Sequence, residues 1–299
     1  MEHKFKNRDR GFHIFINIFL VLLVLGILIP FVLLFISSIS SEQSLTFNGY
    51  SFWPDEFSLD AYRYISRNTK TILRSYGLSM LVTVIGTGLG LVLTALLAYP
   101  LSRRDFTHRN VILFFLFFTM LFNGGMVSNY IMWTQLFHVK NTLAALIFPR
   151  LLLNAFSIIL VKNYYLHSIP AEIMEAAEVD GAGPWQAYSR LVIPLSKPIF
   201  ATIGMFYMLD YWNDWINGLY FVTKPEYYSL QVLLSNILRT VQFLVSNSGR
   251  AGMSANMISI PSVSIRMAIA VLGIVPVLIL FVFFQRYFVK GITMGAVKG

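Results

Sequence analysis

Cysteine is absent from this chain of 299 residues, and charged residues are scarce. Without cysteine there is no disulfide framework, no thiol nucleophile and no thiolate metal site. Charged residues make up only 12% of the sequence, whereas a soluble domain carries about 25%, and the mean hydropathy is +0.65. A chain of this composition cannot be solvated on all sides, so the sequence predicts an integral membrane protein.

Other patterns that carry chemistry are missing as well. The five histidines are scattered without the spacing of a metal site, and there is no glycine-rich phosphate loop followed by lysine. The net charge of +9 fits basic cytoplasmic loops, and no aromatic and basic strip typical of a nucleic-acid binder accompanies it. The sequence therefore predicts no metal or cofactor in this chain, no ATP hydrolysis by it and no nucleic-acid partner.

Apolar runs account for most of the chain, and each is near the roughly 20 residues that a spanning helix needs. The expected fold class is all-α, a polytopic membrane protein with about six transmembrane helices. Basic residues favour a cytoplasmic N-terminus and C-terminus. The predicted spans are Phe12–Ile36, Tyr76–Leu101, Val111–Trp133, Thr142–Tyr164, Pro198–Val222 and Met267–Phe288.

This arrangement divides the chain into a cytoplasmic N-terminal tail over residues 1–11, a transmembrane domain over 12–290 and a cytoplasmic C-terminal tail over 291–299. Between the last two spans, Asn236–Pro261 is rich in Ser, Asn and Gly, so a flexible external loop is expected there.

The stretch Ser168–Pro198 is polar although long apolar runs flank it, and it connects the fourth and fifth predicted spans. Its pattern predicts a helix, a tight turn and a second helix. Gly181 is expected to close the first helix because Gly adopts the left-handed conformation at little cost. Prolines at helix-starting and helix-ending positions mark the other boundaries: Pro170, Pro184, Pro194 and Pro198.

The first helix of this stretch has an apolar stripe with a carboxylate, Glu175, beside it. The stripe consists of small or aliphatic residues at helical spacing: Ile169, Ile173, Ala176 and Ala177. Such a surface suits close docking to a partner protein. It equally suits an amphipathic loop lying on the bilayer, and the pattern alone does not separate the two.

A family resemblance favours the partner protein. The order Glu175, Ala176, Ala177, Asp180, Gly181, Ala182, Ile193, Pro194, Leu195 resembles the EAA loop of binding-protein-dependent ABC importers. That loop is the signature of their membrane permease subunits, and it holds a coupling helix that docks into a cleft of the ATPase subunit. The resemblance therefore implies ATPase-coupling roles for Ile173, Glu175, Ala176, Ala177, Asp180, Gly181 and Ala182.

Polar residues inside the predicted spans are costly and usually have a task. In the fifth span, polar side chains at helical spacing are expected to share one helix face with aromatic residues beside them, as a sugar-binding path requires. An interfacial belt with interhelical hydrogen bonds explains the same pattern. In the third span, Asn123-Gly124-Gly125 predicts a helix break lining a cavity. The candidate path residues are Asn123, Asp210, Trp212, Asn213, Asp214 and Asn217.

Arg150 in the fourth span has two open interpretations. A structural ion pair with Asp210 or Asp214 is as compatible with the sequence as a substrate contact.

Two further segments are similar to carbohydrate-uptake permeases related to the smaller permease of the maltose transporter. They are Tyr211–Asp214 and the end of the chain from Gln285. The resemblance implies a C-terminal docking tail, expected to be extended, with Lys290, Gly291, Gly295 and Lys298 entering a groove between the ATPase subunits. The run Phe122–Met126 is similar to the subgroup that imports complex oligosaccharides.

The resemblance thus implies a permease for an oligosaccharide in the bacterial plasma membrane. The implied partners are a second homologous permease, two ATPase subunits that bind ATP and Mg, and an extracellular solute-binding lipoprotein. The same machine importing a peptide or a polyamine is one alternative. An ion-coupled secondary transporter, with Asp210 or Asp214 as its ion site, is another.

Overall fold

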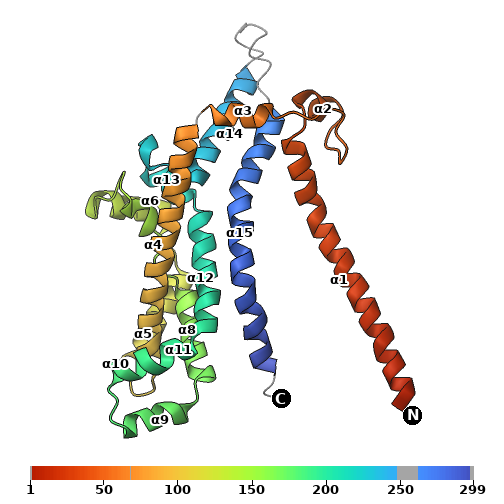
Figure 1. Cartoon of the computed structure of the whole chain (residues 1–299). Coiled ribbons are helices and arrows are strands. Elements are labelled where there is room, and N and C mark those ends of the chain that lie inside the picture. The colour runs from red at the N-terminus through yellow and green to blue at the C-terminus, as the bar shows by residue number, and fades with distance from the viewer. Residues whose placement is uncertain (1, 68, 248–261, 297–299) are drawn as a thin grey trace. The chain divides into compact units, whose positions relative to one another are not determined.

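The computed structural model describes residues 2–67, 69–247 and 262–296 of the chain (Figure 1). These residues form helices and connecting segments, with one isolated β-bridge between Ser40 and Phe57. The chain divides into unit 1, Met1–Thr69 with Asn236–Val275, and unit 2, Lys70–Ser235 with Pro276–Gly299. The predicted all-α fold class is confirmed.

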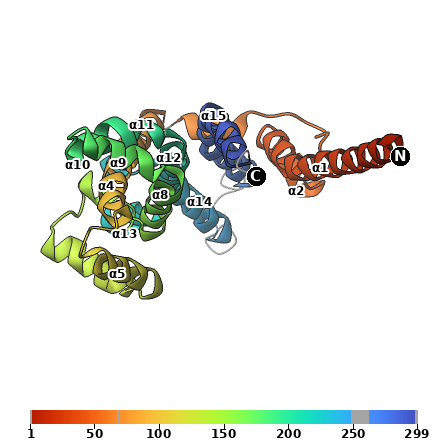
Figure 2. The same cartoon turned by 90° about the horizontal axis from the view of Figure 1, so that it is seen from below.

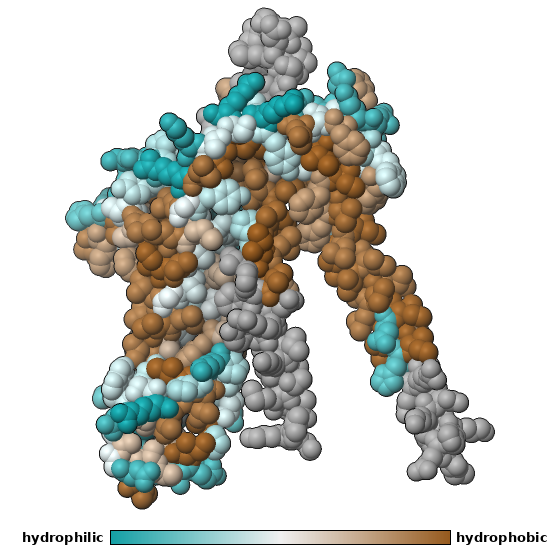
Figure 3. Space-filling model, in the orientation of Figure 1, coloured by the Kyte–Doolittle hydropathy of each residue, from teal (hydrophilic) through white to brown (hydrophobic). Residues whose placement is uncertain are grey.

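Unit 1 begins with the long helix α1 (Glu2–Ser38), whose part from Phe12 onward has a mean hydropathy of 3.3 and is not buried by the rest of the described chain. Figure 3 shows apolar side chains over most of the visible face of this helix. Because a helix that is apolar all round is stable only in an apolar environment, α1 is suited to a position in lipid.

Two short helices follow α1 in unit 1, α2 (Glu42–Phe47) and α3 (Asp60–Ser66). The Glu42 carboxylate accepts hydrogen bonds from the backbone N–H groups of Val263 and Ser264 at 2.9 Å each, in the first turn of α15 (Ser262–Ala296). A carboxylate at this end of a helix satisfies free N–H groups and faces the positive end of the helix dipole. The contact joins segments far apart in the sequence.

The prediction of a flexible loop over Asn236–Pro261 is wrong for its first part. Helix α14 extends from Leu230 to Asn247. Apolar residues recur at helical spacing among the Ser and Asn residues of this segment. Two of them on one face of the helix, Leu234 and Val241, are buried. Residues 248–261 lie outside the described residues.

Unit 2 is built on α4 (Thr69–Ser102), the long helix drawn in orange in Figure 1. The other elements are shorter: α5 (Arg109–Leu121), α6 (Gly125–Ile131), the π turn η1 (Met132–Leu136), α7 (Ala144–Ile147), α8 (Ala155–Ser168), α9 (Ala171–Val179), α10 (Pro184–Ala187), the π turn η2 (Tyr188–Val192), α11 (Ile193–Leu195), α12 (Lys197–Trp212), α13 (Ile216–Phe221) and the 3₁₀ turn η3 (Pro225–Tyr227).

Small residues on α4 allow α12 to approach it closely. A Cβ atom added at Gly86 would overlap the Tyr211 ring, and one added at Gly90 would lie 3.0 Å from the Tyr207 ring. The Tyr207 hydroxyl also lies 2.8 Å from the Thr94 hydroxyl. Both pairs, Gly86 with Gly90 and Tyr207 with Tyr211, are four residues apart, so the two helices present matching faces.

Among the described residues, α1 and α4 are each long and apolar enough to cross a membrane. The count rises to four if each of two bent helix pairs is one span. The first of these, α5 with α6 and η1, bends by 116° at the predicted break. Gly125 has φ +81° there and donates its N–H to the Asn123 side chain at 2.9 Å, which confirms the break.

Candidate functional site

Helix α9 begins and ends as its sequence predicts. Pro170 precedes its first residue, and Gly181 follows its C-cap with φ +78°. The Gly181 N–H donates to the Glu178 carbonyl at 3.0 Å, and the Ala182 N–H donates to the Ala177 carbonyl at 2.9 Å. This pair of bonds is a Schellman motif, which requires a left-handed residue at the Gly181 position. The predicted Gly181 stop is confirmed.

The second limb of the loop runs from Pro184 to Leu195 and joins α12 at a bend of 77°. Its π turn η2 directly precedes α11, which contains Pro194, and the missing N–H of this proline removes one regular helical bond. Tyrosine hydroxyls from the rest of unit 2 hold both ends, because Tyr99 donates to the Pro184 carbonyl at 3.3 Å and Tyr164 to the Leu195 carbonyl at 3.2 Å.

The predicted apolar stripe is only partly free. Ile169 is buried and Ala177 is half-buried, whereas Ile173 and Ala176 are exposed. Met174 on the same helix packs against the core of unit 2. In Figure 1, α9, α10 and α11 lie together at one end of unit 2, and Figure 2 looks directly at that end. The exposed part of α9 is therefore available to a partner.

A charged cluster joins α9 to the end of α4, and it is called the Arg103 cluster here: Arg103, Asp105 and Glu178. Arg103 Nε lies 3.0 Å from Asp105 Oδ1, and its Nη2 lies 3.1 Å from Asp105 Oδ2 and 2.8 Å from Glu178 Oε1. The Arg103 guanidinium holds the pKa of Asp105 below its usual value, and the two carboxylates raise the pKa of Arg103. Arg103 and Asp105 therefore both stay charged at neutral pH.

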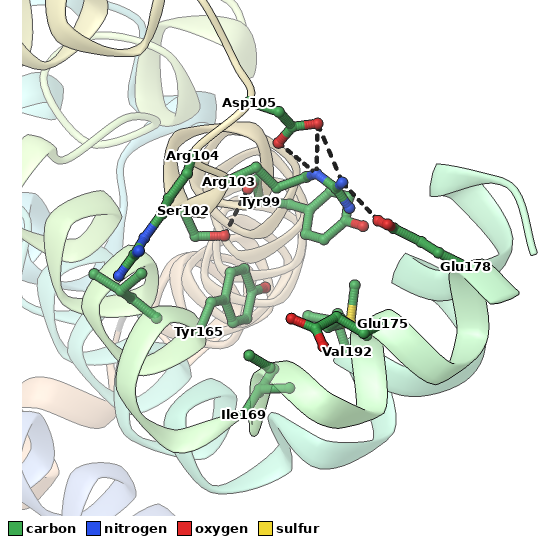
Figure 4. A pocket seen from close by; sticks show the side chains of 13 residues that line it. Tyr99, Ser102, Arg103, Arg104, Asp105, Tyr165, Ile169, Glu175, Glu178 and Val192 are labelled. Atoms are coloured by element: carbon green, nitrogen blue, oxygen red, sulfur yellow. Dashed lines mark hydrogen bonds and ion pairs between the residues drawn. The ribbon is translucent and has the colours of Figure 1, made fainter.

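A cavity of about 390 Å³ lies beside the Arg103 cluster. Its lining residues come from α9 and from the C-terminal ends of α4 and α8. Figure 4 shows Arg103 between Asp105 and Glu178, with Glu175 pointing toward the cavity and Arg104 pointing away from the cluster. Tyr165, which also lines the cavity, is buried.

The polar residues of the fifth predicted span do not share one face of a continuous helix. Helix α12 ends at Trp212, and α13 begins at Ile216. The Asp214 carboxylate accepts hydrogen bonds from the backbone N–H groups of Ile216 and Asn217 at 3.2 and 3.3 Å, so it caps the start of α13. This local bonding competes with helix continuation and explains why the prediction is wrong.

These candidate path residues also differ in burial. Asp210 and Asn213 are exposed and Asp214 is half-buried, whereas Trp212 is 1% exposed and Asn217 is fully buried. Asn123, in the other predicted path segment, is exposed at its helix break. The structure therefore places Trp212 and Asn217 in the protein interior, whereas Asn123, Asp210 and Asn213 are accessible.

The fourth predicted span is not one helix, because residues 148–154 between α7 and α8 are irregular. Pro149 lies in this segment and Arg150 has φ +67°, which is incompatible with a regular helix. Side chains of α12 and α13 bond its backbone: Tyr211 donates to the Ile147 carbonyl at 2.9 Å, Asn217 donates to the Pro149 carbonyl at 2.8 Å, and Tyr207 accepts from the Asn154 N–H at 3.3 Å.

Arg150 itself is exposed, and no ion pair within 4.0 Å joins it to Asp210 or Asp214 in the described chain. The ion-pair interpretation is therefore wrong in this structure.

Comparison with known proteins decides the family. Residues 2–294 match the family model described as the binding-protein-dependent transport system inner membrane component. The chain belongs to this family. The predicted relationship is confirmed, and the permease is an inner membrane component of a transport system that depends on a binding protein.

Known relatives of the permease match it over nearly their whole length. It is 36% identical to the polygalacturonan/rhamnogalacturonan transport system permease protein YtcP of Bacillus subtilis (strain 168), over 98% of this chain and 100% of that protein. It is 35% identical to protein LplC of the same organism, over 91% of this chain and 90% of that one.

A solved structure gives the same answer. A bacterial ABC transporter involved in the import of the acidic polysaccharide alginate has a chain that is 29% identical to the permease, with a TM-score of 0.75. The match covers 94% of this chain and 97% of that chain.

The expected extended tail of the permease is wrong for residues 291–296. Helix α15 continues through Ala296, with Gly291 and Gly295 inside it. Each Gly costs about 1 kcal/mol in a helix, but extending a long helix needs no new nucleus. Lys290 is also helical, whereas Lys298 lies outside the described residues.

Sequence reasoning did not predict the structural roles of Arg103, Tyr207 and Tyr211, although Tyr211 begins the segment that resembles carbohydrate-uptake permeases. Arg103 entered the prediction only as one of the basic cytoplasmic residues. The matching four-residue spacing of the tyrosines and of Gly86 with Gly90 was an available signal for the packing of α12 on α4. No local pattern identified the backbone groups that the tyrosines bind.

Proposed function

We propose that this permease is one of two homologous membrane subunits in an ATP-binding cassette importer that carries an oligosaccharide into a bacterial cell across its plasma membrane. The observation that carries the proposal is α9, a short exposed helix closed by a Schellman motif at Gly181 within an EAA-like sequence. In this proposal α9 is the coupling helix, and it docks into a cleft of an ATPase subunit.

The remaining subunits supply what this chain lacks. Two ATPase subunits bind ATP with Mg and hydrolyse it, and an extracellular solute-binding lipoprotein delivers the substrate. ATP binding closes the ATPase pair, and the coupling helix transmits this movement to the membrane helices. The exposed residues Ile173, Glu175 and Ala176 form the contact, with Asp180, Gly181 and Ala182 fixing its end.

The substrate class rests on the relatives. One is named for polygalacturonan and rhamnogalacturonan transport, and a solved relative imports alginate. We therefore assign an oligosaccharide derived from a polysaccharide or glycan to this importer. Asn123, Asp210, Asn213 and Asp214 are the proposed path residues, and the buried Trp212 and Asn217 support them from behind.

The coupling role is tested with Glu175→Lys in the complete importer. A lysine opposite a basic cleft at a desolvated contact costs several kcal/mol, so oligosaccharide uptake into vesicles is expected to be lost while the chain still inserts. Glu56→Lys is the matched control, because it makes the same charge change at an exposed residue between α2 and α3, in unit 1.

Normal uptake by the Glu175→Lys importer, with full co-purification of the ATPase, would overturn the coupling role.

The substrate is tested in parallel with the unmodified importer and radiolabelled oligogalacturonate, alginate oligomers, a peptide and a polyamine. Uptake of only the peptide or polyamine indicates a non-sugar importer. Sugar uptake by the permease alone, driven by a proton gradient without ATPase, indicates a secondary transporter.

A further inference from the structure

We infer that Arg103 is a positioning residue that fixes α9 on the end of α4, so that the coupling helix of the proposed importer is held in a defined orientation. The inference rests on the proposed function of α9, and it adds a residue outside the EAA-like loop.

Helix α9 has few other contacts that could fix it. None of its residues is buried, and within the described chain its one side-chain hydrogen bond to another element is that of Glu178 with Arg103. Its C-terminal bonds at Gly181 and Ala182 are internal to the turn. A nine-residue helix without a buried side chain is marginal and mobile on its own. Met174 packs against the core of unit 2, and the bond between Glu178 and Arg103 is the polar contact that fixes the orientation of α9 on that core.

Arg103 is suited to this task because Asp105 orients it. Asp105 occupies the Nε and Nη2 side of the guanidinium in a two-bond contact, and Glu178 takes the remaining direction from Nη2. The planar guanidinium is rigid, so the two bonds to Asp105 also fix the direction of the second Nη2 hydrogen, which Glu178 accepts. Only 26% of the Arg103 side chain is exposed, against 68% for Asp105 and 53% for Glu178.

The end of α4, from which Arg103 extends, is part of the core of unit 2. Arg103 follows directly after α4, whose last turn contains the fully buried Leu101. The Tyr99 ring contacts the buried Tyr188 ring in a tilted arrangement, with 4.8 Å between the ring centroids. The backbone next to Arg103 is therefore held by packing. The Arg103 cluster thus links a weakly packed helix to a strongly packed one.

The test combines a distance measurement with a coupling measurement in the complete importer. Since the sequence has no cysteine, spin labels can be placed only at Val179→Cys, which is 87% exposed at the end of α9, and at the exposed Thr107→Cys beyond α4. The distance between the two labels is measured by pulsed electron resonance. In parallel, the ratio of substrate-stimulated to basal ATP hydrolysis is measured without labels.

Arg103→Gln and Glu178→Gln are each expected to broaden the distance distribution and to lower the stimulation ratio about two- to fivefold, as for a partly exposed ion pair. The double variant is expected to be no worse than either single variant, because both remove the same contact. Arg104→Gln is the matched control, since Arg104 is adjacent, exposed and outside the cluster. It is expected to leave both measurements unchanged.

An unchanged distance distribution in Arg103→Gln and Glu178→Gln would overturn the inference, and so would fully additive losses in the double variant. A failure of the proposed function is distinguishable, because it shows in the unmodified importer as an absence of substrate-stimulated ATP hydrolysis. The spin-label distances still report on the position of α9 in that case.

Discussion

Two asparagines in the fifth predicted span show how differently one residue type is used. Asn217 is fully buried and donates its amide to the Pro149 carbonyl, whereas Asn213 is exposed and bonds only the Leu209 carbonyl within its own helix. In an apolar region a polar side chain needs a partner, and both residues have one. Exposure therefore separates the structural asparagine from the candidate path residue.

Single cysteines at these two positions are expected to react differently with a water-soluble thiol reagent. Asn213→Cys should be labelled in at least one nucleotide state of the importer, because the proposed path is open to water there. Asn217→Cys should resist labelling and should lower stability by about 1–2 kcal/mol, since the Pro149 carbonyl loses its donor. Mass spectrometry measures the labelling, and thermal unfolding in detergent measures the stability.

Cysteines at Asp210 and Asp214 extend the same experiment. If positions 210, 213 and 214 all resist the reagent in every nucleotide state, this face is covered by lipid or protein and does not line a path. Equal labelling at 213 and 217 would contradict the difference in burial.

At the scale of elements, α4 and α12 meet through glycines that receive tyrosine rings. The Tyr211 ring lies against Gly86 and its hydroxyl reaches the Ile147 carbonyl in the interrupted fourth segment. A side chain on α4 at this position would push the ring away from that carbonyl. The packing of two helices and the break in a third are thus joined by one side chain.

Gly86→Ala is therefore expected to destabilise the permease by about 1–3 kcal/mol, the usual cost of overpacking, and to lower the unfolding temperature in detergent. Gly88→Ala is the matched control on the same helix, because nothing lies within 4 Å of a Cβ added there. The control should be neutral or slightly stabilising, since Ala favours a helix over Gly. Equal unfolding temperatures for the two variants would contradict the close approach.

Local signals predicted some of these elements, and distant contacts determined the others. The turn after α9 was predictable because Gly181 and its bonding partners lie within a few residues. The break at Gly125 was predictable for the same reason. The break at residues 148–154 was not, because its backbone is bonded by tyrosine and asparagine side chains more than fifty positions later. The Arg103 cluster was missed because 75 residues separate Arg103 from Glu178.

At the scale of the whole molecule, the composition predicted a membrane protein and the EAA-like loop predicted the family, which the match over residues 2–294 confirmed. The number of spans was harder to predict from the sequence, because hydropathy does not show where an apolar segment bends. The described residues contain two continuous candidate spans and two bent pairs, where the sequence predicted about six spans and a break in the third. The C-terminal end differs most, because α15 remains helical where an extended tail was expected.

The C-terminal segment is still expected to dock to the ATPase subunits, now as the end of a helix. Deleting Thr293–Gly299 should weaken ATPase association or its regulation, because the deletion removes the last residues of α15, Thr293–Ala296, which lie beyond the last predicted span, together with the three residues that follow them. Membrane insertion should be unaffected, since every predicted span lies before Thr293. A deletion of equal length at the N-terminus, residues 2–8, is the control and should leave the ATPase stoichiometry of the purified importer unchanged. If the C-terminal deletion purifies with full ATPase stoichiometry and unchanged substrate-stimulated hydrolysis, the segment has no docking role.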